Sequence, residues 1–246
     1  MTYLDNITKQ REVKLMENKR LEKYFKVLEK IDIKNSKILD AGCGSGNESK
    51  YRRSKIFKDC KIYGLDLNPF DNTYVDYPVC GDLYHIPFKD NSFDVVICEM
   101  VAEHIKKPKV MIKELNRVTK KHGKVIIFTP NKLHPIFFLA NLLPQKFVDW
   151  VKLYYYKLPE RENFDVFYKF NDIKTIRRTV NGYFKINELY VYYPEEGFNS
   201  KFLLKIIWNI YKICIPFLPT SMRGGLLVVV MEKEESNISI KRGLGG

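Results

Sequence analysis

The sequence lacks the features that define several classes of protein. Its five cysteines are odd in number, lie far apart and include no CxxC pair. This argues against a disulfide framework, a zinc ribbon or an iron–sulfur cluster, and favours a reducing compartment. No stretch reaches the roughly 18 uninterrupted apolar residues that a membrane-spanning helix needs. Residues 1–30 are heavily charged and lack the apolar segment of a secretory signal. We therefore expect a cytoplasmic protein, for which peripheral contact with a membrane stays open.

The sequence also has fewer acidic than basic residues. The chain has 42 lysines and arginines against 29 aspartates and glutamates, a net charge of +13. Such a balance points to an anionic partner, which could be nucleic acid, a membrane surface or a charged substrate. Apolar residues, in contrast, make up 45% of the 246 residues. The chain can therefore bury a large core, which excludes a disordered protein and fits one domain, with or without an elaborated cap.

Short apolar runs alternate with helical patterns through much of the chain. Apolar residues at helical spacing predict an amphipathic helix over 8–31, and further helices over 47–57, over 108–120 and within 171–183. The predicted strands cover 37–42, 61–67, 79–82, 93–100, 124–130, 183–193 and 225–232. Strands that alternate with crossover helices predict a parallel sheet with right-handed connections.

Two apolar segments go beyond a minimal unit of this kind. Residues 133–158 are crowded with large apolar and aromatic side chains. On a helical wheel of 201–218, the polar residues occupy only about an 80° arc; they are Lys201, Lys205, Asn209 and Lys212. Two interpretations stay open. The segments either cover the sheet as core helices or form a cap that receives a greasy acceptor beside an anionic surface.

A glycine-rich loop follows the first predicted strand. Its sequence, Asp40-Ala-Gly-Cys-Gly-Ser-Gly46, lets backbone N–H groups approach a ligand closely where a helix begins. The dinucleotide fingerprint GxGxxG fails because Asn47 takes the place of its last glycine. A phosphate-binding Walker loop fails too, because no Lys-Ser/Thr pair follows.

From this loop onward, the sequence resembles the class I S-adenosylmethionine-dependent methyltransferases, in particular the type 11 group. Four motifs occur in the family's order: ILDAGCGSGN, LDLN, GDLYHIPFKDNSFDVVICEMVAEHI and ELNRVTKKHGKVIIFTPN. The similarity is close over 36–131 and loose over 171–193. It implies a doubly wound, seven-stranded, mostly parallel sheet whose last strand is antiparallel. The expected organisation is an N-terminal helical segment (1–35), a methyltransferase domain (36–232) with cap insertions at 132–170 and 198–222, and a flexible tail (233–246).

The resemblance also implies a site for S-adenosylmethionine. Asp66 ends the second strand, where a carboxylate can accept hydrogen bonds from both ribose hydroxyls. Asp40 would favour the methionyl ammonium and the sulfonium through its charge. Asp82 would meet the adenine amino group. The full set of expected cofactor-binding residues is Asp40, Gly42, Cys43, Gly44, Gly46, Asp66, Leu67, Asp82, Leu83, Cys98 and Glu99.

The expected acceptor side is less marked in the sequence. Glu103-His104 resembles the family's acidic-His pair, and His104 is the best candidate for a general base because imidazole titrates near neutral pH. The alternative is that His104 orients the loop before Pro108. Further candidates for acceptor binding are Asn131, His134 and Tyr168. No metal constellation is evident.

The fourth strand ends in Cys98-Glu-Met-Val101, which departs from the Asn/Asp-Pro-Pro-Tyr/Phe signature of enzymes that methylate nucleobase amines. The net charge is +3 over 1–35, +4 over 36–131 and +6 over 132–246, without an Arg-rich tract. We therefore expect O- or C-methylation of a lipid-like, isoprenoid or lipid-linked glycan acceptor, at or near a membrane. An RNA or small-metabolite methyltransferase, and a non-catalytic cofactor-binding module, stay open as alternatives. The oligomeric state does not follow from the sequence.

Overall fold

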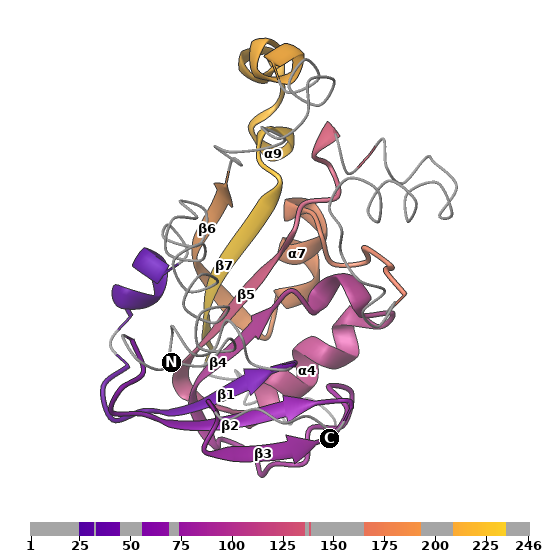
Figure 1. Ribbon diagram of the computed structural model, residues 1–246. Helices are drawn as coiled ribbons and strands as arrows, with labels where there is room; N and C mark the ends of the chain where they lie inside the picture. The colour runs from indigo at the N-terminus through magenta and orange to yellow at the C-terminus, as the bar shows by residue number, and fades with distance from the viewer. Residues whose placement is uncertain are drawn as a thin grey trace, which may run out of the picture.

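In the part of the chain that the structure describes, seven strands form one sheet (Figure 1). The computed structural model describes residues 25–31, 33–44, 56–68, 74–135, 138, 165–192 and 209–234. The strands are β1 (Lys37–Ala41), β2 (Lys61–Asp66), β3 (Tyr77–Cys80), β4 (Phe93–Glu99), β5 (Thr119–Pro130), β6 (Phe184–Tyr192) and β7 (Leu226–Lys233). Their order across the sheet is β3-β2-β1-β4-β5-β7-β6. Strands β1 to β5 pair in parallel, and β7 inserts antiparallel between β5 and β6. The predicted fold class is confirmed.

Helices cover both faces of this sheet. The described ones are η1 (Ala102–His104), α4 (Pro108–Val118), α7 (Ile173–Val180), η3 (Ile215–Phe217) and α9 (Thr220–Arg223), with helical turns at 25–29 and 209–214. In Figure 1, α4 and α7 lie on one side of the sheet and the turn at 25–29 lies on the other. Among the described residues, no helix combines the length and the apolar character needed to span a bilayer.

Successive side chains of the central strands belong in turn to two hydrophobic clusters, one on each face of the sheet. On β7, Leu227, Val229 and Met231 join the cluster beneath α4 and α7. Their neighbours Val228 and Val230 belong to the cluster on the opposite face. Phe25, Leu28 and Ile31 pack in the same cluster. Successive strand residues point to opposite faces, so a continuously apolar strand belongs at the centre of a sheet that is covered on both sides.

The described strand boundaries lie within one residue of the predicted ones except in two strands. β5 begins at Thr119 rather than at residue 124, and its first pairing, Phe93 with Thr119, is separated from the rest by a register shift. The polar residues Thr119-Lys-Lys-His122 give no apolar signal for this start, because Lys121 and His122 are exposed. β3 covers 77–80 rather than 79–82.

Several predictions lie outside the described residues. They are the helix over 47–57 for all but its last two residues, Gly46, most of 8–31 and of 133–158, the first part of 201–218, and the tail beyond 234.

Candidate cofactor and acceptor site

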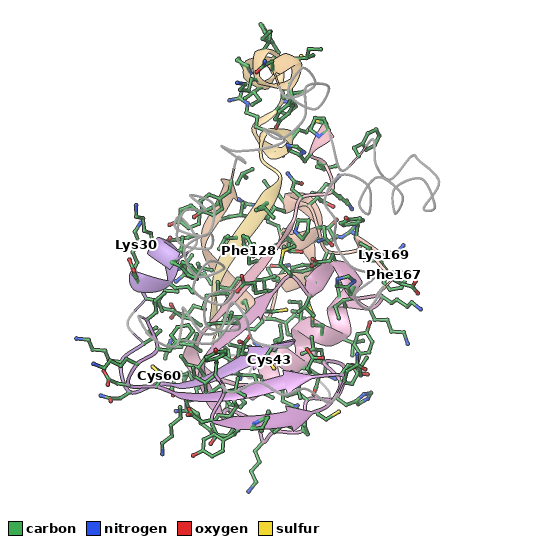
Figure 2. The ribbon with its side chains drawn as sticks, viewed as in Figure 1. Lys30, Cys43, Cys60, Phe128, Phe167 and Lys169 are labelled. Carbon is green, nitrogen blue, oxygen red and sulfur yellow. The ribbon has the colours of Figure 1, made fainter. Side chains whose placement is uncertain are left out.

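The carboxyl ends of β1, β2 and β4 meet at one edge of the sheet, because these strands run parallel. The chain leaving β1 turns over the end of β2, where Gly42 and Cys43 both donate their N–H groups to the carbonyl of Leu65, at N···O distances of 2.6 and 3.1 Å. Figure 2 shows Cys43 beside β1, while Cys60, which precedes β2, lies toward the opposite edge of the sheet. The glycine loop is therefore anchored to the strand that carries Asp66.

Gly42 is required by its conformation and by its surroundings. Its φ is +84°, in the left-handed region that favours glycine. A Cβ at this position would lie 2.2 Å from Cγ2 of Val101. The loop after β4 therefore packs directly onto the backbone of the glycine loop, with no room for a side chain between them.

Asp66 contacts the same loop at Gly44. Its Oδ2 accepts a hydrogen bond from the N–H of Gly44 at 2.9 Å, and its Oδ1 accepts one from the N–H of Asn68 at 3.2 Å. A carboxylate oxygen can accept more than one hydrogen bond, so the half-buried carboxylate keeps capacity for ligand hydroxyls. The next side chain, Leu67, is 59% exposed and offers an apolar surface beside this carboxylate.

Three buried carboxylates lie at or just beyond the carboxyl ends of β1 and β4. Asp40, Glu99 and Glu103 are 5, 9 and 4% exposed. Burial, followed by the charges of Glu103 and Asp40, raises the pKa of the Cys98 thiol, which places Cys98 near both carboxylates. Burial also raises the pKa of Glu103, although a backbone hydrogen bond, the charge of His104 and a hydrogen bond from Thr129 oppose this rise. A buried carboxylate stabilises a cation in its neighbourhood.

The loop after β3 completes the cofactor side. Asp82 accepts a hydrogen bond at Oδ1 from the N–H of Tyr84, at 2.9 Å. Gly81 donates its N–H to the carbonyl of Asp66, at 2.8 Å, and Leu83 is buried in the core. Asp82 is therefore tied by Gly81 to the end of β2, beside Asp66.

On the acceptor side, the segment 165–172 lies against η1. The N–H groups of Phe167 and Tyr168 both donate to the carbonyl of Glu103, at 2.7 and 3.2 Å. Nδ1 of His104 lies 3.0 Å from the carbonyl oxygen of Asp165. Because a carbonyl only accepts, this contact makes Nδ1 the protonated nitrogen and leaves Nε2 of the neutral ring with its lone pair. Figure 2 shows Phe167 and Lys169 on this segment, at the side of the sheet near η1.

A buried hydrogen-bond chain links this segment to the strand ends. The hydroxyl of Thr129 donates to Oε2 of Glu103 at 3.2 Å and accepts from Nδ2 of Asn171 at 2.6 Å. The same Nδ2 lies 3.1 Å from the carbonyl of Pro130. Burial, followed by the charge of Glu103, raises the pKa of Tyr168, so its phenol lies near the same carboxylate.

The residues at this edge fit S-adenosylmethionine. Gly42 leaves backbone where a side chain would intrude, Asp66 offers acceptors for hydroxyls, and the buried carboxylates suit an ammonium and a sulfonium. Independently, residues 39–127 match the sequence profile of the type 11 family described as "Methyltransferase domain". Residues 39–127 therefore form a class I S-adenosylmethionine-dependent methyltransferase domain.

Known proteins with the same domain differ in their acceptors. The chain is 32% identical over 108 residues to the chloroplastic tocopherol O-methyltransferase of Arabidopsis thaliana, covering 39% of this chain and 30% of that one. It is 31% identical over 108 residues to the tRNA U34 carboxymethyltransferase of Nautilia profundicola, covering 40% and 36%. The chain thus matches about a third of the length of these two relatives.

A solved structure agrees with the fold. Phosphoethanolamine N-methyltransferase 2 of Haemonchus contortus, in complex with S-adenosyl-L-methionine, has a TM-score of 0.53 to this chain. The superposition covers 87% of this chain and 53% of the other, at 18% sequence identity. At that identity the likeness concerns the fold of the methyltransferase domain alone.

The methyltransferase domain places most of the predicted cofactor residues at one edge of the sheet. Gly42, Gly44 and Asp82 lie in the loops at the strand ends, and Asp66 is the last residue of β2. Asp40, Cys98 and Glu99 lie within the last two residues of β1 and β4. Their individual roles stay predictions.

The predicted acceptor residues take up different positions. Asn131 is buried, and its Nδ2 donates to the carbonyls of Ser221 and Gly224 at 2.8 and 2.7 Å. These contacts connect the end of β5 to the segment that precedes β7, which is a structural role. His134 is 1% exposed, lies edge-on to Tyr211, and has its pKa lowered to about 4 by burial. Of the proposed acceptor residues, Tyr168 and the base candidate His104 lie on the two segments that meet at the carbonyl of Glu103.

Three residues of this region do not follow from the sequence patterns. The sequence motif includes Glu103 in the acidic-His pair, but no sequence pattern predicts that its side chain is buried. Thr129 and Asn171 carry no signal at all, because they are 42 residues apart and become partners only through the fold.

Proposed function

We propose that the protein transfers a methyl group from S-adenosylmethionine to an oxygen or carbon atom of a lipid-like, isoprenoid or lipid-linked glycan acceptor. The observation that carries the cofactor part is the burial of three carboxylates, those of Asp40, Glu99 and Glu103, at and just beyond the carboxyl ends of β1 and β4. Buried carboxylates are costly unless a cation or hydrogen bonds accompany them. S-Adenosylmethionine, when bound, supplies an electrophilic methyl group on a sulfonium.

The chain's own residues would position the acceptor and handle its proton. Positioning alone can supply much of the rate of a displacement, and a base is needed where the acceptor hydroxyl must lose its proton. His104 presents Nε2 as that base, since Nδ1 is held by the carbonyl of Asp165. Glu103, whose charge acts on the same imidazole, would stabilise the protonated ring.

The lipid-like acceptor is supported by the composition of 133–158 and 201–218, which are rich in large apolar side chains and in lysine. The relative that methylates tocopherol supports the same class of acceptor. The tRNA carboxymethyltransferase keeps RNA as the second candidate, which the charge of +13 also favours. An isolated protein incubated with methyl-labelled cofactor and fractionated cell extract distinguishes them. We expect label in the lipid fraction, whereas label in RNA alone would replace the acceptor class.

Cofactor binding has its own test. We expect Asp66→Ala to weaken the binding of S-adenosylhomocysteine, measured by calorimetry, by about 10- to 100-fold, because hydrogen bonds to a charged group contribute about 1.5–3 kcal/mol. Asp90→Ala is the matched control, since Asp90 is exposed and pairs with Arg117 away from the site. Equal affinity in both variants would contradict the proposed cofactor site.

The base has a separate test. We expect His104→Gln to lower turnover while the affinity for S-adenosylhomocysteine stays within about twofold, since His104 lies on the acceptor side. Unchanged turnover would remove His104 from the chemistry and leave it the role of orienting the loop before α4.

A further inference from the structure

Three large apolar side chains near the C-terminus face solvent. Ile210, Ile213 and Phe217 are 57, 71 and 87% exposed. We call the residues 209–224, which include η3 and α9, the tip. Ile210 and Ile213 lie on one side of the helical turn 209–214, because residues three apart are neighbours on a helix surface. Tyr211, on another side of the turn, is only 6% exposed.

Contacts within the tip hold these side chains outward. The guanidinium of Arg223 donates to the carbonyls of Leu218 and Pro216, at 2.7 and 3.1 Å. The hydroxyl of Tyr211 donates to the carbonyl of Arg223. His134 packs edge-on against Tyr211, with ring centroids 4.9 Å apart. The turn that carries Phe217 is therefore tied to α9 and to the chain that follows β5.

The tip stands at the edge of the sheet where the strands end. Figure 1 shows the helical turn beyond α9, above the end of β5 and the start of β7. Asn131, the residue that follows β5, donates to the carbonyls of Ser221 and Gly224. Two residues earlier, Thr129 donates to Glu103. A short stretch of backbone thus connects the acceptor side of the site with the tip.

The sequence around the tip carries charge of a single sign. Residues 197–231 contain four cations, Lys201, Lys205, Lys212 and Arg223, and no aspartate or glutamate. Lys212 is exposed and adjoins Ile213. Apolar side chains flanked by lysines suit an anionic bilayer, in which the apolar groups enter the acyl boundary and the ammonium groups stay among the headgroups.

We propose that the tip is a membrane-docking face, which inserts Ile213 and Phe217 into the surface of an anionic bilayer. This extends the lipid-like acceptor proposed above, because it would bring the carboxyl edge of the sheet to the surface where such acceptors lie. Docking is measured as binding and needs no methyl transfer. Its failure would therefore leave methyl transfer untouched, and failed methyl transfer would leave docking untouched.

The test is co-sedimentation of the full chain with vesicles of phosphatidylcholine, with and without phosphatidylserine. We expect binding that needs the anionic lipid and weakens as salt rises. Phe217→Asp should reduce the bound fraction at least tenfold, and Lys212→Glu should reduce it less. The matched control is Val110→Asp, because Val110 is also exposed (37%) but lies in the first turn of α4, where a carboxylate is tolerated.

Each other outcome counts against the proposal. Absence of wild-type binding to anionic vesicles, or equal binding by Phe217→Asp and Val110→Asp, would overturn it. If light scattering instead shows a dimer that Phe217→Asp dissociates, and vesicles bind no wild-type protein, the face belongs to a second copy of the chain. Thermal unfolding of each variant verifies that a loss of binding does not come from a loss of folding.

Discussion

Gly42 and Gly182 adopt nearly the same backbone conformation in different surroundings. Their φ values are +84° and +81°. A Cβ on Gly182 would meet nothing within 4 Å, whereas a Cβ on Gly42 would lie 2.2 Å from Cγ2 of Val101. The pair therefore separates the two reasons for which a glycine can be required, the left-handed conformation and the close approach of another group.

We expect Gly182→Ala to lower the free energy of unfolding by about 1–2 kcal/mol, the cost of a left-handed alanine. Gly42→Ala should cost at least about 2 kcal/mol more, because Val101 must also move, and it should weaken the binding of S-adenosylhomocysteine. Urea unfolding and calorimetry on both variants measure the two effects. If both variants lose the same free energy of unfolding, Val101 and the loop after β4 move aside without measurable cost, which would contradict the second reason.

At the scale of the element, α7 depends on the residue before it. Asp172 accepts hydrogen bonds from the N–H and the hydroxyl of Thr175, both at 2.8 Å, and its Oδ2 lies 2.6 Å from Nζ of Lys132. Burial alone would raise the pKa of Asp172, but the hydrogen bonds from Lys132 and Thr175 outweigh it and lower the pKa. This single carboxylate starts the helix and ties it to the end of β5.

We expect Asp172→Ala to destabilise the protein by about 1–2 kcal/mol through loss of the cap, and Asp172→Asn to destabilise it less, since asparagine also caps helices. The pKa of Asp172 is lower in the folded state, so its charge stabilises the fold above the unfolded pKa of about 3.9. That contribution is lost as the pH falls through the folded value. Urea unfolding between about pH 5 and 3 should show wild type losing more stability than Asp172→Asn. Parallel pH profiles would refute the linkage.

The elements were largely predictable and their long-range ties were not. Short apolar runs mark β2 and β4, and Pro108 marks the start of α4, because these signals are local in sequence. The glycine loop and Asp66 were recognisable for the same reason. The contacts of Asn171 with Thr129, and of Asp172 with Lys132, join β5 to a segment about 40 residues away, and no periodicity encodes them. A helical wheel shows that 201–218 has a narrow polar face, but it does not show that Phe217 is exposed.

At the scale of the whole molecule, the strand order determines which strands are best protected from backbone hydrogen exchange. The resemblance supplied this order, because periodicity does not rank strands. β7 is buried over its first six residues and pairs with β5 on one side and β6 on the other. β3 pairs with β2 alone among the described strands, and three of its four residues are exposed. The last described strand, β7, therefore lies inside the sheet, while the early strand β3 forms one of its edges.

This arrangement predicts a gradient of backbone hydrogen exchange across the sheet. Amides of β4, β5 and β7 should exchange only through global unfolding, because each of these strands is paired on both sides and buried on both faces. Amides of β3 should exchange at least about tenfold faster, through local opening. Peptide-resolved exchange measured by mass spectrometry tests this, with β1 as the internal control, since it lies between β2 and β4. S-Adenosylhomocysteine should slow exchange at the carboxyl ends of β1 and β2 and leave β7 unchanged. Equal rates in β3 and β7 would contradict the strand order as the source of protection.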